Sequence, residues 1–197
     1  MHLKKIVIII FIYILNLNNL NAIEPDVFVQ STVNRASKIL SDNISKEQKI
    51  NELKLIAEET VFIEKVGLYS LGSFRKTLTN EQKEKYLFLF EQYFLKSFSS
   101  RLSEWTNPRI DVNSKKIINK NYTMVNSILK GTSERPEVKI NWRIYTKNPE
   151  NPLIVDVIIE GLSLARTQKE EFSSILNSND GDINALFKTL EEFSKNQ

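Results

Sequence analysis

The order of two hydrophobic periodicities is the feature of this chain that most limits its fold. Apolar residues recur with helical spacing up to about residue 103, alternate with polar residues between about 110 and 160, and then return to helical spacing. The short polar turns 131–136 and 147–152 join the alternating segments. Strands joined in this way pair antiparallel, because a parallel pair needs a crossover of about a dozen residues. We therefore expect an α+β fold, with N-terminal helices and two C-terminal helices packed on a twisted antiparallel sheet of about four strands.

Several helix starts are marked by residues that accept hydrogen bonds from first-turn amides. Ser45 and Thr79 each stand three residues before a glutamine, which is the pattern of a capping box. Thr167 stands three residues before Glu170 and predicts another start, and Asp182 leads into the last helix. The expected helices begin near Asp26, Ser45, Thr60, Thr79, Thr167 and Asp182, and the expected strand segments are 110–112, 117–118, 121–130, 137–146 and 153–159.

The first 22 residues have the order of a secretory signal peptide. Lys4 and Lys5 precede the apolar run 6–15, and a polar stretch then ends at Ala22. The ten residues of this run are too few to cross a bilayer, which takes ~20 residues in a helix. We expect residues 1–22 to be cleaved after export to the periplasm and residues 23–197 to form one domain. The alternative is an uncleaved membrane anchor.

The residue types that the chain lacks exclude several classes of enzyme. The chain has no cysteine, and its one histidine, His2, lies in the expected signal peptide. The rest of the chain therefore has no Cys–His or Ser–His–Asp catalytic group and no histidine-ligated zinc site. We expect no catalytic residue, no metal and no cofactor.

The charge balance gives no indication of a nucleic-acid partner. Without Lys4 and Lys5 the chain carries 25 Lys and Arg against 24 Asp and Glu, which is a net charge of +1. At this balance, short basic groups such as Lys115–Lys116 are typical of a solvated surface rather than of a phosphate-binding patch.

Asp156 and Glu160 are the carboxylates that most resemble a catalytic pair. Four residues of strand separate them by ~13 Å, which exceeds the spacing of ~5–10 Å in glycoside hydrolases. We expect Asp156 to be a buried acid paired with Arg143 or Arg166, since buried charges need a partner. Ser163 lacks both the second glycine of a nucleophile elbow and a histidine base, so we expect a structural role for it.

The segment from Tyr86 to Phe98 is too apolar for a helix that has one side in water. Apolar residues occupy more than half of its circumference, whereas a helix packed on a sheet needs only a stripe. Either both sides of this helix are covered, or one side faces a dry internal space. We expect the fold to enclose an apolar pocket, of the concave kind that binds ligands.

Short fragments in a fixed order extend over most of the chain, from about Val27 to Phe193. They are Phe62-(x)9-Gly72-(x)2-Arg75-(x)3-Thr79-(x)2-Gln82, Phe90-(x)2-Tyr93, Asp156-Val157-(x)2-Glu160-Gly161-Leu162-Ser163-Leu164, Gln168-(x)3-Phe172-(x)3-Leu176, Gly181-Asp182-Ile183 and Leu186-(x)3-Leu190. In their order and spacing they resemble the MlaC family, also called toluene-tolerance proteins. The resemblance implies a periplasmic carrier of phospholipids, which bind through two acyl chains. It also implies transfer between an outer-membrane lipoprotein complex and an inner-membrane ABC transporter that maintain lipid asymmetry.

For such a carrier we expect a monomer with a pocket of aliphatic and aromatic side chains, and a lipid headgroup near solvent beside Arg75 or Arg166. The expected lining residues are Val66, Phe90, Tyr93, Phe94, Met124, Trp142, Val157, Ile159 and Leu164. Two alternatives remain. One is a cone-fold enzyme that acts on an apolar small molecule with Asp156 or Glu160 as base, and the other is a periplasmic chaperone for apolar segments. A carboxylate inside the pocket would favour the enzyme.

Overall fold

The computed structural model describes residues 22–133 and 135–195. The expected signal peptide therefore lies outside the described residues, except for Ala22. Within the described chain there are six α-helices, one short 3₁₀ helix and five strands. The helices are α2 (Pro25–Ser41), α3 (Lys46–Thr60), α4 (Ile63–Ser70), η1 (Phe74–Lys76), α5 (Asn80–Leu102), α6 (Leu164–Asn177) and α7 (Ile183–Lys195). The strands are β1 (Ile110–Asn119), β2 (Tyr122–Leu129), β3 (Val138–Tyr145), β4 (Leu153–Ile159) and β5 (Leu162–Ser163).

Both predicted glutamine capping boxes are present and begin α3 and α5. The Ser45 hydroxyl accepts a hydrogen bond from the Gln48 backbone N–H at 3.2 Å, and the Gln48 side chain accepts from the Ser45 backbone N–H at 2.9 Å. Thr79 and Gln82 repeat this arrangement at 3.2 and 3.0 Å. These reciprocal bonds satisfy amides that have no partner inside the helix, so the starts of α3 and α5 are set locally.

The prediction of one helical segment from Thr60 to Leu71 was wrong at its start. α3 ends at Thr60, and α4 begins only at Ile63. Between them the chain turns towards the sheet, where Val61 forms an isolated parallel bridge with Ile154 of β4. The Phe62 backbone N–H also donates to the Ile154 carbonyl at 2.9 Å. This contact between distant parts of the chain interrupts a helix that the local pattern favours.

The five strands form one antiparallel sheet in the order β1–β2–β3–β4–β5, which confirms the predicted meander with one strand more than expected. The expected short strands 110–112 and 117–118 are parts of β1, whose register shifts between Val112 and Ser114. The additional strand, β5, has only two residues and pairs with the end of β4. A pairing this short leaves no alternating pattern in the sequence.

The register gives the sheet two distinct faces. Val125, Trp142 and Val157 lie side by side across β2, β3 and β4. Val125 is completely buried in a cluster with residues of α2, so we call this side the α2 face. Met124 and Asp156 pair with the same residue of β3 and lie on the opposite face. Directly paired residues share a face of a sheet, whereas successive residues alternate.

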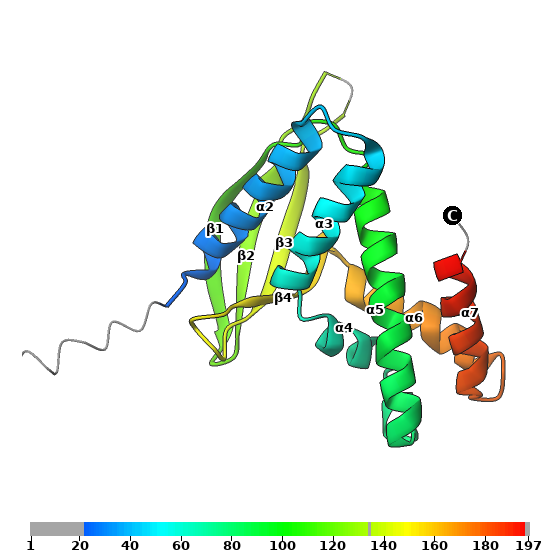
Figure 1. Ribbon diagram of the computed structural model, residues 1–197. Coiled ribbons are helices and arrows are strands. Elements are labelled where there is room, and N and C mark those ends of the chain that lie inside the picture. Colours follow the sequence, from blue (N-terminus) through cyan, green and yellow to red (C-terminus); the bar gives the residue numbers. More distant parts are fainter. Residues whose placement is uncertain (1–21, 134, 196–197) are drawn as a thin grey trace, which may run out of the picture.

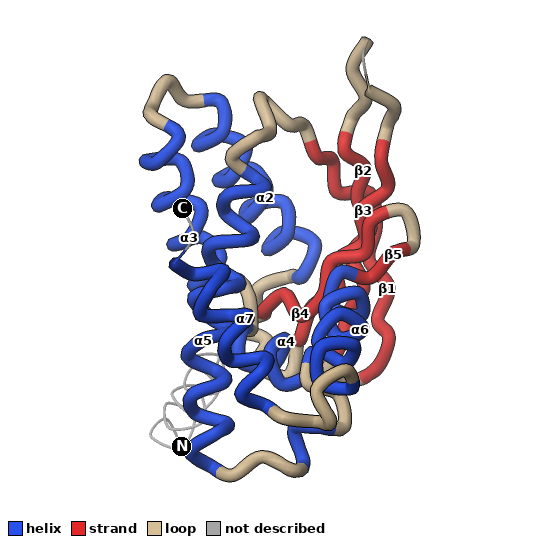
Figure 2. Tube along the Cα trace, turned by 90° about the vertical axis from the view of Figure 1, so that its right-hand side faces the viewer, coloured by secondary structure: helices blue, strands red, loops and turns tan. Residues whose placement is uncertain are grey.

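The helices pack in a series that leads away from the sheet. α2 packs on β1 and β2, and α3 packs on both α2 and α5 (Figure 1). α6 begins at the sheet, where it packs on β4 and β5, and it also contacts α4 and α7. In the view turned by 90° the strands form a layer on one side and α5 and α7 lie on the other (Figure 2).

The buried apolar side chains form two clusters. The helical core joins α4, α5, α6 and α7, and the sheet core lies between α2 and the α2 face. Val61 is half-buried and packs against both clusters. The helical core consists of Val66, Leu71, Tyr86, Leu89, Phe90, Phe172, Leu176, Ile183, Leu186, Phe187 and Leu190, and the sheet core consists of Val29, Val33, Val125, Ile144 and Ile154.

The wide apolar surface of α5 is explained mainly by helices on several of its sides. α5 packs on α3, α4 and α7. Of the two arrangements expected for this helix, coverage on both sides therefore accounts for most of its apolar residues. Phe94 and Phe98 remain half-buried, and Phe88 is 63% exposed.

Gly67 allows α4 to approach α5 closely. The Tyr86 hydroxyl donates to the Gly67 carbonyl at 2.9 Å, and a Cβ added at Gly67 would lie 2.7 Å from Cδ1 of Phe90. We expect Gly67→Ala to lower the free energy of unfolding by about 1–3 kcal/mol, because overpacking outweighs the gain of about 1 kcal/mol in helix propensity. Urea denaturation measures this change. In a Phe90→Leu background the same substitution should be neutral or stabilising, and an equal loss in both backgrounds would contradict the proposed clash.

Candidate functional site

Four aromatic rings form a ladder along α5. Successive ring centroids from Tyr86 through Phe90 and Phe94 to Phe98 are 5.8, 6.1 and 5.6 Å apart, with interplanar angles of 30°, 24° and 12°. Phe172 of α6 meets the first two rings edge-on, a geometry that ring quadrupoles favour. The ladder is buried at Tyr86 and Phe90 and half-buried at Phe94 and Phe98. Its second half therefore presents apolar surface that the protein covers only in part.

The two tyrosines of α5 that adjoin this ladder are uncharged at neutral pH. Burial raises the pKa of the Tyr86 phenol far above its usual value. Burial also raises the pKa of Tyr93, and a hydrogen bond with Gln168 partly opposes this effect. The Tyr93 hydroxyl donates to Oε1 of Gln168 at 2.9 Å and so links α5 to α6.

An open groove of about 500 Å³ lies between α5, α6 and α7. Tyr93, an expected lining residue, forms part of its wall, and the Tyr93 ring lies 4.8 Å from the ring of Phe193. Arg101 and Glu171 supply charged groups at this groove. The groove is lined by Tyr93, Ser97, Arg101, Gln168, Glu171, Phe172, Ser174, Ile175, Thr189, Leu190 and Phe193.

On the α2 face, apolar cover is incomplete next to β4. Trp142 and Val157 pack against the sheet core but are only half-buried, and Ile159 is 36% exposed. The Trp142 indole N–H donates to the Ser127 hydroxyl at 2.8 Å, which satisfies its polar atom and leaves the ring as an apolar surface. Leu164, the first residue of α6, is 44% exposed. Four expected lining residues thus lie close to the connection from β4 through β5 to α6.

Three further expected lining residues have different surroundings. Val66 and Phe90 are buried within the helical core. Met124 is half-buried on the opposite face of the sheet, so a cavity on the α2 face would not include it.

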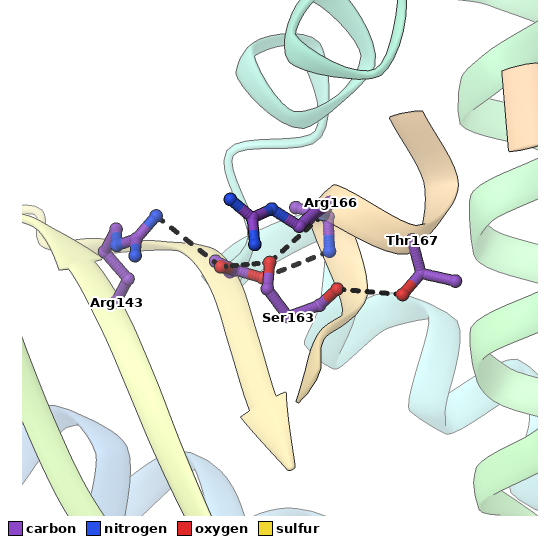
Figure 3. A network of polar contacts seen from close by, with 6 residues as sticks. Arg143, Ser163, Arg166 and Thr167 are labelled. Atoms are coloured by element: carbon purple, nitrogen blue, oxygen red, sulfur yellow. Dashed lines mark hydrogen bonds and ion pairs between the residues drawn. The ribbon is translucent and has the colours of Figure 1, made fainter. Parts of the chain in front are cut away.

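A buried carboxylate fixes the start of α6 against β4 (Figure 3). Asp156 is 6% exposed, and its Oδ2 accepts a hydrogen bond from the Ser163 hydroxyl at 2.7 Å. Its Oδ1 accepts from the Ala165 backbone N–H at 3.1 Å. The Arg143 guanidinium lies 3.6 Å from Oδ2. The prediction of a buried acid with a basic partner is confirmed, and the partner is Arg143.

Ser163 caps α6, which confirms its structural role. Its hydroxyl accepts from the Arg166 backbone N–H at 3.1 Å, as Figure 3 shows. The prediction that Thr167 begins this helix was wrong, because the helix already begins at Leu164. The Thr167 hydroxyl instead donates to the Ser163 carbonyl at 3.1 Å, one turn back along the helix.

The two expected headgroup-proximal arginines lie near a third cation, Lys169. Arg166 and Lys169 line a polar hollow of about 550 Å³ together with Tyr69 of α4. The Lys169 ammonium lies 5.6 Å from the centroid of the Tyr69 ring, and its side chain passes beside Gly72. Arg75 is exposed and donates to the Gly72 carbonyl at 2.7 Å. Arg75 and Lys169 thus share Gly72 as a neighbour.

Sequence reasoning missed residues in both hollows. Lys169 follows Arg166 by three positions on a helix, and this spacing places both on one side, so it was a usable signal. Arg101 and Phe193 come from the ends of α5 and α7, and only the packing of these helices brings them together.

The described residues hold no group of three Asp, Glu, His or Cys side chains that is arranged to bind a metal ion. Among the helices of residues 22–133 and 135–195, none combines the length and the apolar character needed to cross a membrane.

The Asp156 network predicts unequal effects of its two charged members. Asp156→Ala should lower the free energy of unfolding by about 2–4 kcal/mol, because the Ser163 hydroxyl and the Ala165 amide lose their acceptor. Arg143→Ala should cost less than about 1 kcal/mol, since its side chain is 40% exposed. Urea denaturation followed by circular dichroism measures both. A larger loss for Arg143→Ala would show that the ion pair, not the hydrogen bonds, holds α6 in place.

Comparison with protein-family models matches residues 30–192 to the model described as MlaC protein. No curated protein was found to match the chain. Among solved structures, the chain is similar to a phospholipid-binding protein from Ralstonia solanacearum, solved in complex with a phospholipid. The TM-score is 0.72 at 17% identity, over 87% of this chain and 97% of that chain, which shows a common fold. Because the family model spans most of the sequence, this chain belongs to the MlaC family.

Proposed function

We propose that this chain is a periplasmic carrier that binds one phospholipid by its two acyl chains. In this proposal it passes the lipid between an outer-membrane lipoprotein complex and an inner-membrane ABC transporter that maintain lipid asymmetry. Residues 1–22 are a cleaved signal peptide, and residues 23–197 are the lipid-binding domain, acting as a monomer. The observation that carries the proposal is the fold, shared with a protein solved in complex with a phospholipid, in a family matched over residues 30–192.

A lipid carrier has to hide acyl chains from water without holding them more tightly than a membrane does. Each methylene group left in water costs ~0.8 kcal/mol, so two chains exposed together cost tens of kcal/mol. A protein interior of comparable apolar character makes transfer from a bilayer nearly neutral in free energy. The direction of transport is then set by the partners rather than by the carrier.

In this proposal the acyl chains lie between the helical core and the α2 face of the sheet. The support is the apolar surface that both sides leave partly covered. Phe94 supplies it on α5, Trp142, Val157 and Ile159 supply it on the sheet, and Leu164 supplies it at the start of α6. Apolar surface removed from water contributes about 25 cal/mol per Å², so an acyl chain that covers these residues stabilises the complex.

The headgroup phosphate lies beside Arg166 and Lys169, with Arg75 close by. The support is that these cations adjoin one hollow at the surface of α4 and α6, whose wall also carries hydroxyl and amide groups. Guanidinium and ammonium groups bind phosphate oxygens by charge-assisted hydrogen bonds. Glu170 also lines this hollow and limits its positive charge.

The surroundings of the two carboxylates favour binding over catalysis. Asp156 lies on the opposite face of the sheet, and both of its oxygens accept hydrogen bonds. Glu160 is exposed at the turn between β4 and β5, where it accepts from the Lys139 backbone N–H at 2.5 Å. Both candidate bases of the enzyme alternative thus have structural partners.

The direct test is to purify the protein gently from cells, record its native mass spectrum, and extract and identify any bound lipid. We expect one phospholipid per protein chain. Protein that carries apolar peptides and no phospholipid would support the chaperone alternative, and protein with neither ligand would contradict the carrier.

Substitutions test where the acyl chains bind. We expect Ile159→Glu and Phe94→Glu to reduce bound phospholipid by about tenfold or more, because each buries a carboxylate in an apolar site. Phe88→Glu is the matched control, since Phe88 lies on the same helix as Phe94 and is 63% exposed. Thermal unfolding by circular dichroism checks that each variant is folded. If Phe193→Glu alone abolished lipid binding, the acyl chains would lie in the groove between α5, α6 and α7 instead.

Charge reversal tests the headgroup position. We expect Arg166→Glu and Lys169→Glu to lower the share of phosphatidylglycerol relative to phosphatidylethanolamine in the extracted lipid, because a nearby carboxylate repels the net negative headgroup. The total amount of lipid per chain should stay the same. Lys188→Glu, on the exposed side of α7, is the control. An unchanged lipid composition in both variants would move the headgroup away from this hollow.

A further inference from the structure

The end of the β1–β2 hairpin exposes two adjacent isoleucines. Ile117 is 74% exposed and Ile118 is 47% exposed, although both belong to a strand. β1 is an edge strand of the sheet. Ile117 pairs with Thr123, but the register shifts before Asn119, so Ile118 has no residue paired with it on β2. Figure 1 shows this hairpin on the side of the molecule away from α5 and α7.

Positive charge accompanies this pair. The sequence from 112 to 133 contains four lysines and no acidic residue. Lys115 is bound by two acids of the N-terminal segment, Glu24 and Asp26. Lys116 and Lys120, which flank the isoleucines, form no ion pair with any described residue. We call Lys116, Ile117, Ile118 and Lys120 the isoleucine tip.

The surroundings of the isoleucine tip do not cancel its charge. The nearest turn is that between β3 and β4, because the Thr146 backbone N–H donates to the Asn121 carbonyl at 2.8 Å. This turn carries Lys147 and Glu150, which are both exposed and opposite in sign. Lys130, at the far end of the hairpin, pairs with acids of its own.

Lysines on an edge strand often serve to prevent pairing with another sheet. That role does not explain exposed isoleucines, which make an edge more adhesive rather than less. Two apolar side chains flanked by lysines match the interface of a bilayer instead. The apolar groups enter the acyl boundary, while the long lysine side chains reach the phosphates above it. Charge alone indicates only a solvated surface, and the exposed isoleucines are the added observation.

We propose that the isoleucine tip docks the protein on anionic phospholipid bilayers. The contact involves two apolar side chains and two unpaired lysines, so it is weak, reversible and sensitive to salt. It goes beyond the proposed carrier function, because it concerns a bilayer surface and not a lipid held inside the protein. It also leaves the hollow beside Arg166, on the surface of α4 and α6, free of the membrane contact.

The test is co-sedimentation of the full mature chain with vesicles of phosphatidylglycerol and phosphatidylcholine, and with vesicles of phosphatidylcholine alone. We expect binding to the first, little binding to the second, and loss of binding at high salt. Ile117→Ser/Ile118→Ser and Lys116→Glu/Lys120→Glu should each weaken binding by about tenfold. The matched controls are Phe88→Ser, which removes another exposed apolar side chain, and Lys38→Glu/Lys188→Glu, which makes the same change in net charge elsewhere.

Equal binding by the tip variants and the wild-type protein would overturn the proposal, and so would equal losses in the controls. No binding of the wild-type protein to the phosphatidylglycerol vesicles would overturn it as well. If the tip variants bound vesicles normally but lost a protein partner in pull-down, the tip would be a protein-docking site. Extraction of bound lipid from the same variants separates this proposal from the carrier function, because the tip variants should keep their internal lipid.

Discussion

The rest of the structure depends on how the hydrophobic side chains are divided between two clusters that meet at Val61. The helical core is closed by α4, α5, α6 and α7, and the sheet core is closed by α2. Val61 packs against both, and its backbone bridges to Ile154 of β4, so this short link between α3 and α4 ties the clusters together. Each cluster buries its own apolar side chains, and the surfaces that face away from the two centres stay partly covered. A fold with one continuous core would have filled that surface with its own side chains.

A second constraint comes from one buried carboxylate. Asp156 would be costly to bury alone, and the Ser163 hydroxyl, the Ala165 amide and the Arg143 guanidinium offset that cost. Because these donors come from β3, β5 and the first turn of α6, the carboxylate fixes the direction in which α6 leaves the sheet. The same geometry brings the exposed Leu164 beside the end of β4. Polar groups on one face of the sheet thus position an apolar surface at its edge.

The two proposals assign different parts of the molecule to different tasks. The acyl chains need a water-free surface between the cores, and the membrane needs a protruding element that approaches lipid phosphates without unfolding the domain. The isoleucine tip lies on β1, whereas Phe94 and Leu164 lie on α5 and α6. Docking and lipid binding can therefore be altered separately. For a carrier this separation is useful, since it can leave a membrane while it still holds a lipid.

Features that depend on neighbours in the chain were predictable. The capping boxes at Ser45 and Thr79 involve residues three positions apart, and the alternation of β2, β3 and β4 reports burial on one face of a sheet. The paired state of Asp156 was also predictable, because a carboxylate in a buried strand needs a partner. The start of α6 was not, since the sequence offers both Ser163 and Thr167 as caps. Only the contact of Ser163 with Asp156 distinguishes them.

The sequence by itself determined the α+β class, the order of the elements, the antiparallel meander and the membership of the MlaC family, because these follow from short-range periodicity, turn length and motif spacing. The tertiary structure decided the break at Val61, the division into two cores, the surroundings of each expected lining residue and the exposure of Ile117 and Ile118. Each of these depends on which distant segment covers a given side chain. The same apolar residue is core under one neighbour and binding surface without it, and local sequence does not contain that neighbour.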